Sequence, residues 1–99
     1  MAFRLIWSQT AKYDLRNIAA YVAEDSPSAA NQFVRSIFQA VERLADFPES
    51  GRIVPEFTDP VIREVIRKPC RIVYRVDNRK RTIEIVRVWH AARGTPHLP

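Results

Sequence analysis

Apolar residues recur every three or four positions in two stretches of the first half of the chain, which is the period of an amphipathic helix. In the first stretch these positions are Ala11, Leu15, Ile18, Ala19 and Val22. Ser8 or Thr10 can cap this helix, which we expect to end near residue 24. In the second stretch they are Ala30, Phe33, Val34, Ile37, Val41 and Leu44. Ser26 and Pro27 predict its start and Pro48 its end. Only a few residues separate the two helices, so we expect an antiparallel hairpin.

Shorter segments rich in β-branched and aromatic residues predict four strands, at residues 3–7, 61–68, 71–77 and 82–90. Residues 48–60 hold three of the seven prolines and predict an irregular loop. The last three strands are expected to pair consecutively and antiparallel. The element order predicts an α+β fold, β-α-α-β-β-β, with the helical hairpin packed on one face of a small, mainly antiparallel sheet. We expect residues 1–99 to form a single domain.

The last predicted strand has apolar residues of both parities. Ile83 and Ile85 point to one face, and Val86 and Val88 to the other. Either a β-bulge shifts the phase or both faces are partly covered. We favour a central strand that is apolar on both sides.

Two helices can cover only one face of a small sheet, so we expect the other face to be open. On the parity opposite Ile72, Tyr74 and Val76, the sequence places Arg71, Val73 and Arg75. Such a mixed apolar and basic face predicts a docking site for a segment that carries acidic and large apolar residues.

The charge of the chain is concentrated in its second half. The net charge is +5; residues 1–50 contribute −1 and residues 51–99 contribute +6. This asymmetry favours a polyanionic partner, which could be RNA, DNA or an acidic protein segment. The single cysteine excludes an internal disulfide, and the two histidines do not supply a zinc site, so we predict no metal. Neither a glycine-rich phosphate loop nor a membrane span is present in the sequence, which predicts no cofactor, no membrane and a cytoplasmic location.

Four segments resemble the RelE/ParE superfamily of toxins from bacterial type II toxin-antitoxin systems. They read WSQTAKYDLRNIAAYVAEDSP, VERLADFPESGRIVPEF, IREVIRKPCRIVYRV and IEIVRVWHAARG, and they span nearly the whole chain in the right order. The resemblance implies a toxin that arrests growth. It also implies a cognate antitoxin, ParD-like or a related small DNA-binding protein, whose C-terminal segment wraps the toxin.

The superfamily has two branches with different chemistry. RelE-like members are ribosome-dependent mRNA endoribonucleases that need no metal. Such a reaction requires a proton acceptor, a proton donor and cations for the phosphorane charge. Here Arg71 and Arg87 would supply charge and His90 would titrate. RelE-like nucleases usually carry a tyrosine near the C-terminus, whereas this chain has none after Tyr74.

ParE-like members lack that constellation, and the resemblance implies that they poison DNA gyrase. The WSxxAxxDL opening and the VWHAAR close look more like this branch, which we therefore favour. A non-toxic binding module for an acidic partner is the second alternative. The expected target- or antitoxin-binding residues comprise Arg63, Arg67, Lys68, Arg71, Val73, Arg75, Arg87, His90 and Arg93.

Several of these residues also have a purely structural interpretation. For His90 we favour a structural role, either donating to a backbone carbonyl or packing on Trp89, over general-base catalysis. Cys70 lacks an acid partner or an oxyanion motif and is interpreted as a buried core residue. Arg79, Lys80 and Arg81 are expected in a solvated hairpin turn.

Overall fold

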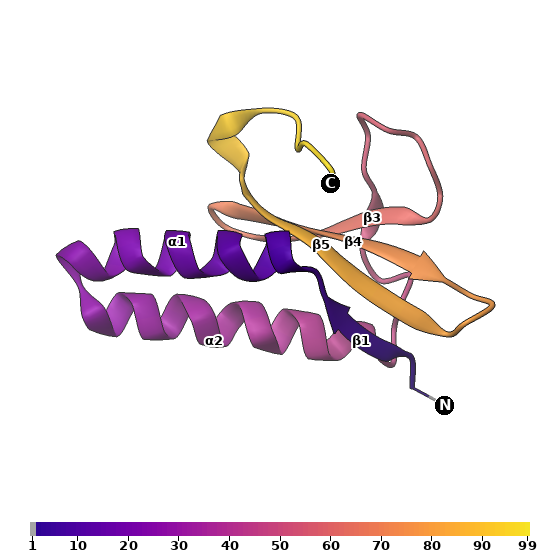
Figure 1. Cartoon of the computed structure of the whole chain (residues 1–99), viewed down its shortest axis with the longest axis horizontal. Coiled ribbons are helices and arrows are strands. Elements are labelled where there is room, and N and C mark those ends of the chain that lie inside the picture. The colour runs from indigo at the N-terminus through magenta and orange to yellow at the C-terminus, as the bar shows by residue number, and fades with distance from the viewer. Residues whose placement is uncertain (1) are drawn as a thin grey trace.

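The computed structural model describes residues 2–99 and contains two helices and five strands (Figure 1). In chain order the elements are β1 (Arg4–Trp7), α1 (Gln9–Asp25), α2 (Pro27–Leu44), β2 (Arg52–Ile53), β3 (Ile62–Arg67), β4 (Cys70–Asp77), β5 (Thr82–His90) and the 3-10 turn η1 (Ala91–Arg93). The predicted α+β order is confirmed. The sequence did not indicate β2, which is only two residues long and lies in the predicted loop. Neither helix is long and apolar enough to cross a membrane.

Serine caps define the helical hairpin. The Ser8 hydroxyl accepts a hydrogen bond from the Ala11 amide at 3.0 Å, and the Ser26 hydroxyl accepts one from the Ala29 amide at 3.1 Å. Each cap satisfies an amide that has no partner inside its helix. Helix α2 ends at Leu44, before Pro48, because residues 45–50 form a turn that leads to β2. The two helices lie side by side and antiparallel (Figure 1).

The strands form one mixed sheet in the order β1-β5-β4-β3-β2. Only the β1–β5 pair is parallel; the other three pairs are antiparallel. Strand β5 therefore has a neighbour on each side, and its apolar residues are buried on both faces. The register also shifts, because Val73 pairs with Arg87 while Tyr74 pairs with Ile85, which leaves Val86 as an extra residue. The favoured central strand and the alternative bulge are both present.

The main core lies between the helices and one face of the sheet. Its buried side chains come mainly from both helices and from strands β4 and β5, among them Leu15, Ile37, Val41, Leu44, Ile72, Tyr74, Ile85 and Val88. Helix α1 also runs along β5 beyond the end of β1, where the Ser8 hydroxyl donates to the Val86 carbonyl at 3.2 Å. This arrangement brings the first two turns of α1 against the C-terminal half of β5.

The expectation of an uncovered second face is wrong. A smaller apolar cluster lies there, formed by Val54, Ile62, Val73 and Val86, and Phe57 and Leu98 pack against it. The β2–β3 loop and the C-terminal tail both fold over the side of the sheet away from the helices (Figure 1). Val54, Phe57 and Leu98 lie in these irregular segments. Their apolar side chains cover this face of the sheet, a role that a third helix would otherwise have.

Candidate functional site

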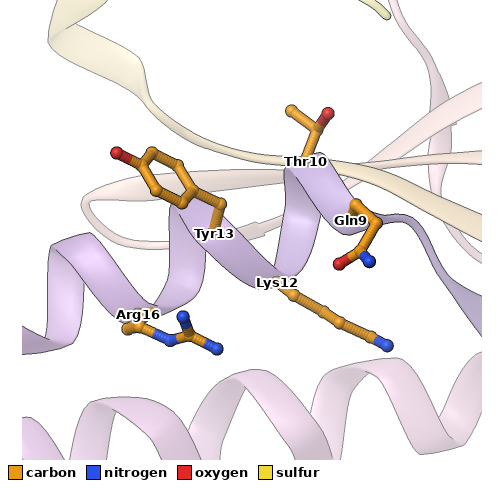
Figure 2. Close-up of a pocket in the computed structure, with 5 residues that line it drawn as sticks. All are labelled: Gln9, Thr10, Lys12, Tyr13 and Arg16. Atoms are coloured by element: carbon orange, nitrogen blue, oxygen red, sulfur yellow. The ribbon is translucent and has the colours of Figure 1, made fainter.

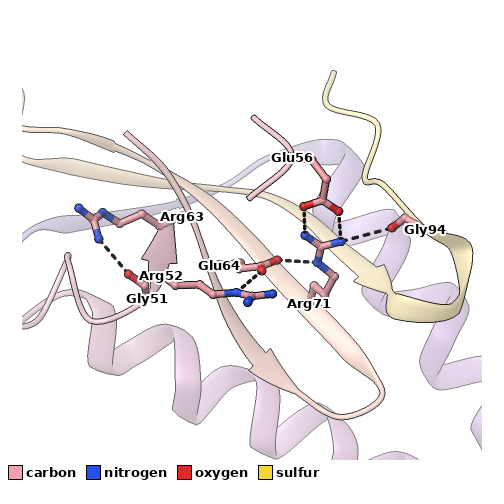
Figure 3. A network of polar contacts seen from close by, with 7 residues as sticks. All are labelled: Gly51, Arg52, Glu56, Arg63, Glu64, Arg71 and Gly94. Carbon is pink, nitrogen blue, oxygen red and sulfur yellow. Dashed lines mark hydrogen bonds and ion pairs between the residues drawn. The ribbon is translucent and has the colours of Figure 1, made fainter. Parts of the chain in front are cut away.

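Arg71 lies at the centre of a charged network on the sheet face away from the helices (Figure 3). Its side chain is 9% exposed, and its Nε donates to Glu64 at 2.5 Å. Its two terminal nitrogens donate to the two carboxylate oxygens of Glu56 at 2.8 and 2.7 Å. The Gly94 carbonyl accepts a further bond from Arg71 at 3.3 Å. All three nitrogens of this guanidinium are therefore used inside the molecule.

The carboxylate of Glu56 is held in its charged form. The hydrogen bonds from Arg71 lower the pKa of Glu56 from 4.5 to about 2. The same bonds to Glu56 and Glu64 raise the pKa of Arg71. Glu64 is fully buried and bridges Arg71 to Arg52, whose Nε lies 2.6 Å from its second oxygen. A buried carboxylate with two guanidinium partners is a structural ion cluster whose charges cancel one another.

A second ion pair joins α1 to β5. Arg87 donates from Nε and Nη2 to the two oxygens of Asp14, each at 2.8 Å. The same carboxylate accepts a hydrogen bond from the Val88 amide at 3.1 Å. It therefore provides an acceptor for a backbone amide of β5 beyond the end of β1. Arg87 also donates to the His97 carbonyl at 2.8 Å. Asp14 is the aspartate of the WSxxAxxDL motif, and the sequence analysis assigned it no role. The sequence feature that could have indicated this role is the position of a charged residue directly beside the apolar stripe of α1.

Trp89 organises the C-terminal segment. Its indole nitrogen donates to the Gly94 carbonyl at 3.0 Å. The guanidinium carbons of Arg87 and Arg93 lie 4.7 and 4.1 Å from the ring centre, within the range of cation–π attraction. The ring that packs on Trp89 belongs to His97, with centroids 5.4 Å apart. Tail residues are thereby attached to the strand that precedes them.

His90 has a structural contact that differs from the expected ones. Its Nδ1 accepts a hydrogen bond from the Ala92 amide at 3.1 Å and so begins the turn η1. A neutral imidazole whose Nδ1 is an acceptor carries its proton on Nε2. The remaining nitrogen is then a donor, and the lone pair that a general base needs is already occupied. The ring lines a cavity of about 350 Å³ together with Tyr13, Asn17 and Arg93.

The strand register distributes the nine predicted residues over both faces of the sheet. Residues directly opposite in a ladder share a face. Arg63 pairs with Tyr74, and Arg67 pairs with Cys70, so both lie on the helix side. His90 also pairs with Cys70. Arg71, Val73, Arg75 and Arg87 lie on the other side, where Val73 is fully buried beneath the covering segments.

The remaining members of the predicted set have separate environments. Arg63 donates to the Gly51 carbonyl at 3.0 Å, and its Nε is buried without a partner. Arg75 forms a half-exposed pair with Glu84 at 3.2 Å. Lys68 and Arg93 are exposed. The nine residues therefore do not form one continuous surface.

Cys70 is buried, as expected from its interpretation as a core residue. Burial raises the pKa of its thiol from 9.0 to about 11. Among residues 2–99, His, Cys, Asp and Glu side chains do not gather in any group of three or more that could hold a metal ion.

Comparison with known proteins places this architecture in a family. The model of the ParE toxin of the type II toxin-antitoxin system parDE matches residues 5–94. The chain belongs to this ParE toxin family. It is therefore a toxin of the type II toxin-antitoxin class, within the RelE/ParE superfamily.

Two relatives match over nearly their full length. The protein Y4kP of Sinorhizobium fredii is 34% identical over 97 residues, which cover 96% of this chain and 95% of that protein. Toxin RelE2 of Caulobacter vibrioides is 32% identical over 92 residues, which cover 91% of this chain and 97% of that toxin.

Solved structures share the fold. A chain of the chromosomal ParDE system of Pseudomonas aeruginosa superposes with a TM-score of 0.71 at 27% identity, covering 90% of this chain and 96% of that one. The RelBE2 complex of Mycobacterium tuberculosis gives 0.67 at 18% identity, covering 91% and 99%. A mutant of Escherichia coli RelE gives 0.68 at 15% identity, covering 95% and 88%. At these last two identities the likeness concerns the fold alone.

Proposed function

We propose that this ParE-family toxin inhibits DNA gyrase in the cytoplasm and is neutralised by a cognate antitoxin. The observation that carries the proposal is the match of the ParE toxin family over residues 5–94. The structural likeness to a chain of the Pseudomonas aeruginosa ParDE system supports the same branch. In this proposal the toxin acts by binding and not by a reaction of its own.

The state of the two candidate catalytic arginines supports a binding toxin over a nuclease. A phosphorane dianion is stabilised by cations that are free to face it. Arg71 is neutralised by Glu56 and Glu64, and Arg87 by Asp14. If either guanidinium moved toward RNA, its carboxylate partner would stay behind in a buried site without a counter-charge. Breaking a buried pair in this way costs roughly 3–5 kcal/mol. The lone pair of His90 Nδ1 is also engaged.

The antitoxin part of the proposal rests on the family and on charge. The RelBE2 and ParDE structures are named as toxin-antitoxin systems, and this chain shares their fold. The excess of +6 in residues 51–99 favours an acidic polypeptide as the neutralising partner. We expect a small reading frame beside this gene that encodes a DNA-binding N-terminus and an acidic amphipathic C-terminus.

Purified toxin in a gyrase assay tests the proposal. We expect dose-dependent loss of supercoiling and accumulation of cleaved DNA attached to gyrase, both reversed by the product of the adjacent reading frame. A parallel reaction with translating ribosomes should leave mRNA intact. Unaffected supercoiling with mRNA cut within translated codons would instead identify a RelE-like nuclease, the activity suggested by the similarity to toxin RelE2.

A further inference from the structure

A hollow of about 300 Å³ lies at one end of the sheet, on the face away from the helices. Its lining includes Arg4, Ile6, Arg75, Lys80 and Glu84. The strand register places Ile6 opposite Glu84 and Glu84 opposite Arg75, so these three side chains share one face. The side chains of Arg75 and Glu84 are each 41% exposed. The β2–β3 loop and the tail therefore leave this end of the face open to a partner.

Cations from β1, β4 and the β4–β5 turn gather around this hollow. The Arg4 amide donates to the Arg81 carbonyl at 2.9 Å, which holds the start of β1 beside the turn. The Arg81 guanidinium carbon lies 4.6 Å from the centre of the Phe3 ring. Together with Arg4, residues 75–84 carry five cations and two acids, which is a net charge of +3. The parallel pairing of β1 with β5 thus adds a cation from the N-terminal strand to the basic turn.

Hydrogen bonds to Asp77 order the turn that carries two of these cations. Its Oδ1 accepts hydrogen bonds from the amides of Arg79 and Lys80, each at 3.0 Å. Both of these side chains are exposed, and the turn projects away from the helical hairpin (Figure 1). Within residues 2–99, Arg4, Arg79 and Lys80 form no ion pair, unlike the neutralised arginines described above. These three cations are therefore available to an anionic partner.

The chemistry of this end of the sheet favours the phosphate groups of a nucleic acid. Among the described residues that line the hollow only Ile6 is apolar, whereas protein interfaces depend on a few well-packed anchors, often aromatic. Affinity for nucleic acid comes largely from Lys and Arg side chains that neutralise phosphates. Both acids are already engaged, since Glu84 pairs with Arg75 at 3.2 Å and Asp77 accepts the turn amides. A two-stranded β-ribbon, such as β4–β5, also fits the major groove of duplex DNA.

We propose that this basic end of the sheet, defined by Arg4, Arg75, Arg79 and Lys80, binds the phosphate backbone of duplex DNA. The inference rests on the proposed function, because a toxin that traps gyrase on cleaved DNA acts beside a DNA duplex. Phosphate contacts position a protein on DNA and carry no sequence information. With one phosphate each for Arg4, Arg79 and Lys80, the logarithm of the affinity should fall with the logarithm of the salt concentration with a slope of about −2.7. Kd should then rise about 40-fold between about 50 and 200 mM salt.

DNA binding by the purified toxin, measured without gyrase, tests this assignment. The probe is a short fluorescent DNA duplex, whose anisotropy gives Kd at both salt concentrations. Arg79→Gln combined with Lys80→Gln removes two of the three phosphate contacts. In this turn variant the slope should change to about −1, and Kd at low salt should rise by about 10-fold or more.

The matched control removes two exposed cations from a different element. Lys12 and Arg16 extend from the side of α1 that faces α2 (Figure 2). Lys12→Gln combined with Arg16→Gln gives the same net charge as the turn variant and should raise Kd less than about 3-fold. Melting curves of both variants should match that of the native toxin, because all four residues are exposed.

Each other outcome overturns the assignment. Equal Kd values for the turn variant and the α1 control would show that DNA binding reflects total charge or lies elsewhere. Tighter binding of single-stranded RNA of the same length, or of poly-glutamate, would identify a different polyanion as the partner. A native toxin that binds no duplex DNA even at low salt would reject the site outright. Because this assay contains no gyrase, a failed gyrase assay beside intact DNA binding would reject the proposed function alone.

Discussion

Removing the buried carboxylate of Glu64 should destabilise the toxin far more than removing its exposed partner. In Glu64→Ala, the Nε of Arg71 loses its acceptor in a site where the Arg71 side chain is only 9% exposed. Breaking a buried pair in this way costs roughly 3–5 kcal/mol. Arg71 keeps its two bonds to Glu56, so we expect about 3 kcal/mol. For a domain of this size that lowers the Tm by about 12–24 °C.

Two controls separate the ion cluster from loss of packing. Arg52→Ala removes the other partner of Glu64, but the Arg52 side chain is 60% exposed, so the cost should stay below about 1 kcal/mol. Glu64→Leu combined with Arg71→Met replaces the pair with apolar side chains and should recover most of the loss, since Glu56 is exposed enough to be solvated. Urea unfolding followed by circular dichroism measures all four proteins. A Glu64→Ala variant no less stable than Arg52→Ala would refute the view that this cluster is structural.

Three further predictions concern single residues. Gly51→Ala should lower the free energy of unfolding in urea by about 1–3 kcal/mol, because the new Cβ would lie 2.5 Å from the Glu64 carbonyl and 2.6 Å from the Tyr74 hydroxyl. Ser50→Ala changes an exposed neighbour and should not lower it. The pKa of Glu56 is lowered to about 2, so its contribution to stability is present above pH 4.5 and is lost as pH falls toward 2. Glu56→Gln should remove this part of the dependence of stability on pH. The same pH dependence in the variant and the native protein would contradict the prediction. Cys70, whose pKa is raised to about 11, should react with a thiol reagent at neutral pH only as fast as the protein unfolds, and rapid labelling of the native protein would show otherwise.

The elements that local physics determines were predictable from the sequence. Ser8 and Ser26 cap their helices through contacts with residues three positions away. The apolar positions of both parities in residues 82–90 correctly indicated a central strand. These features depend on periodicity and neighbouring residues, which a sequence displays directly.

The features that could not be predicted from the sequence depend on contacts between residues that are far apart in the chain. Leu98 packs against the smaller apolar cluster, but nothing in the short tail marks it as part of a core. The register of β3 against β4 places Arg63 on one face and Arg71 on the other, which neither strand reveals alone. The partners of the arginines come from separate elements: Asp14 and Arg87 are 73 positions apart. Charge counting identified the basic half of the chain, but it could not identify which of its cations are already neutralised.

The most direct test of the central claim is the recovery of gyrase-linked DNA from cells that express this toxin without its antitoxin. A gyrase poison predicts that DNA breaks covalently attached to gyrase accumulate within the time that growth stops, while transcripts remain full length. Growth arrest without gyrase-linked DNA, accompanied by transcripts cut within their codons, would contradict the account.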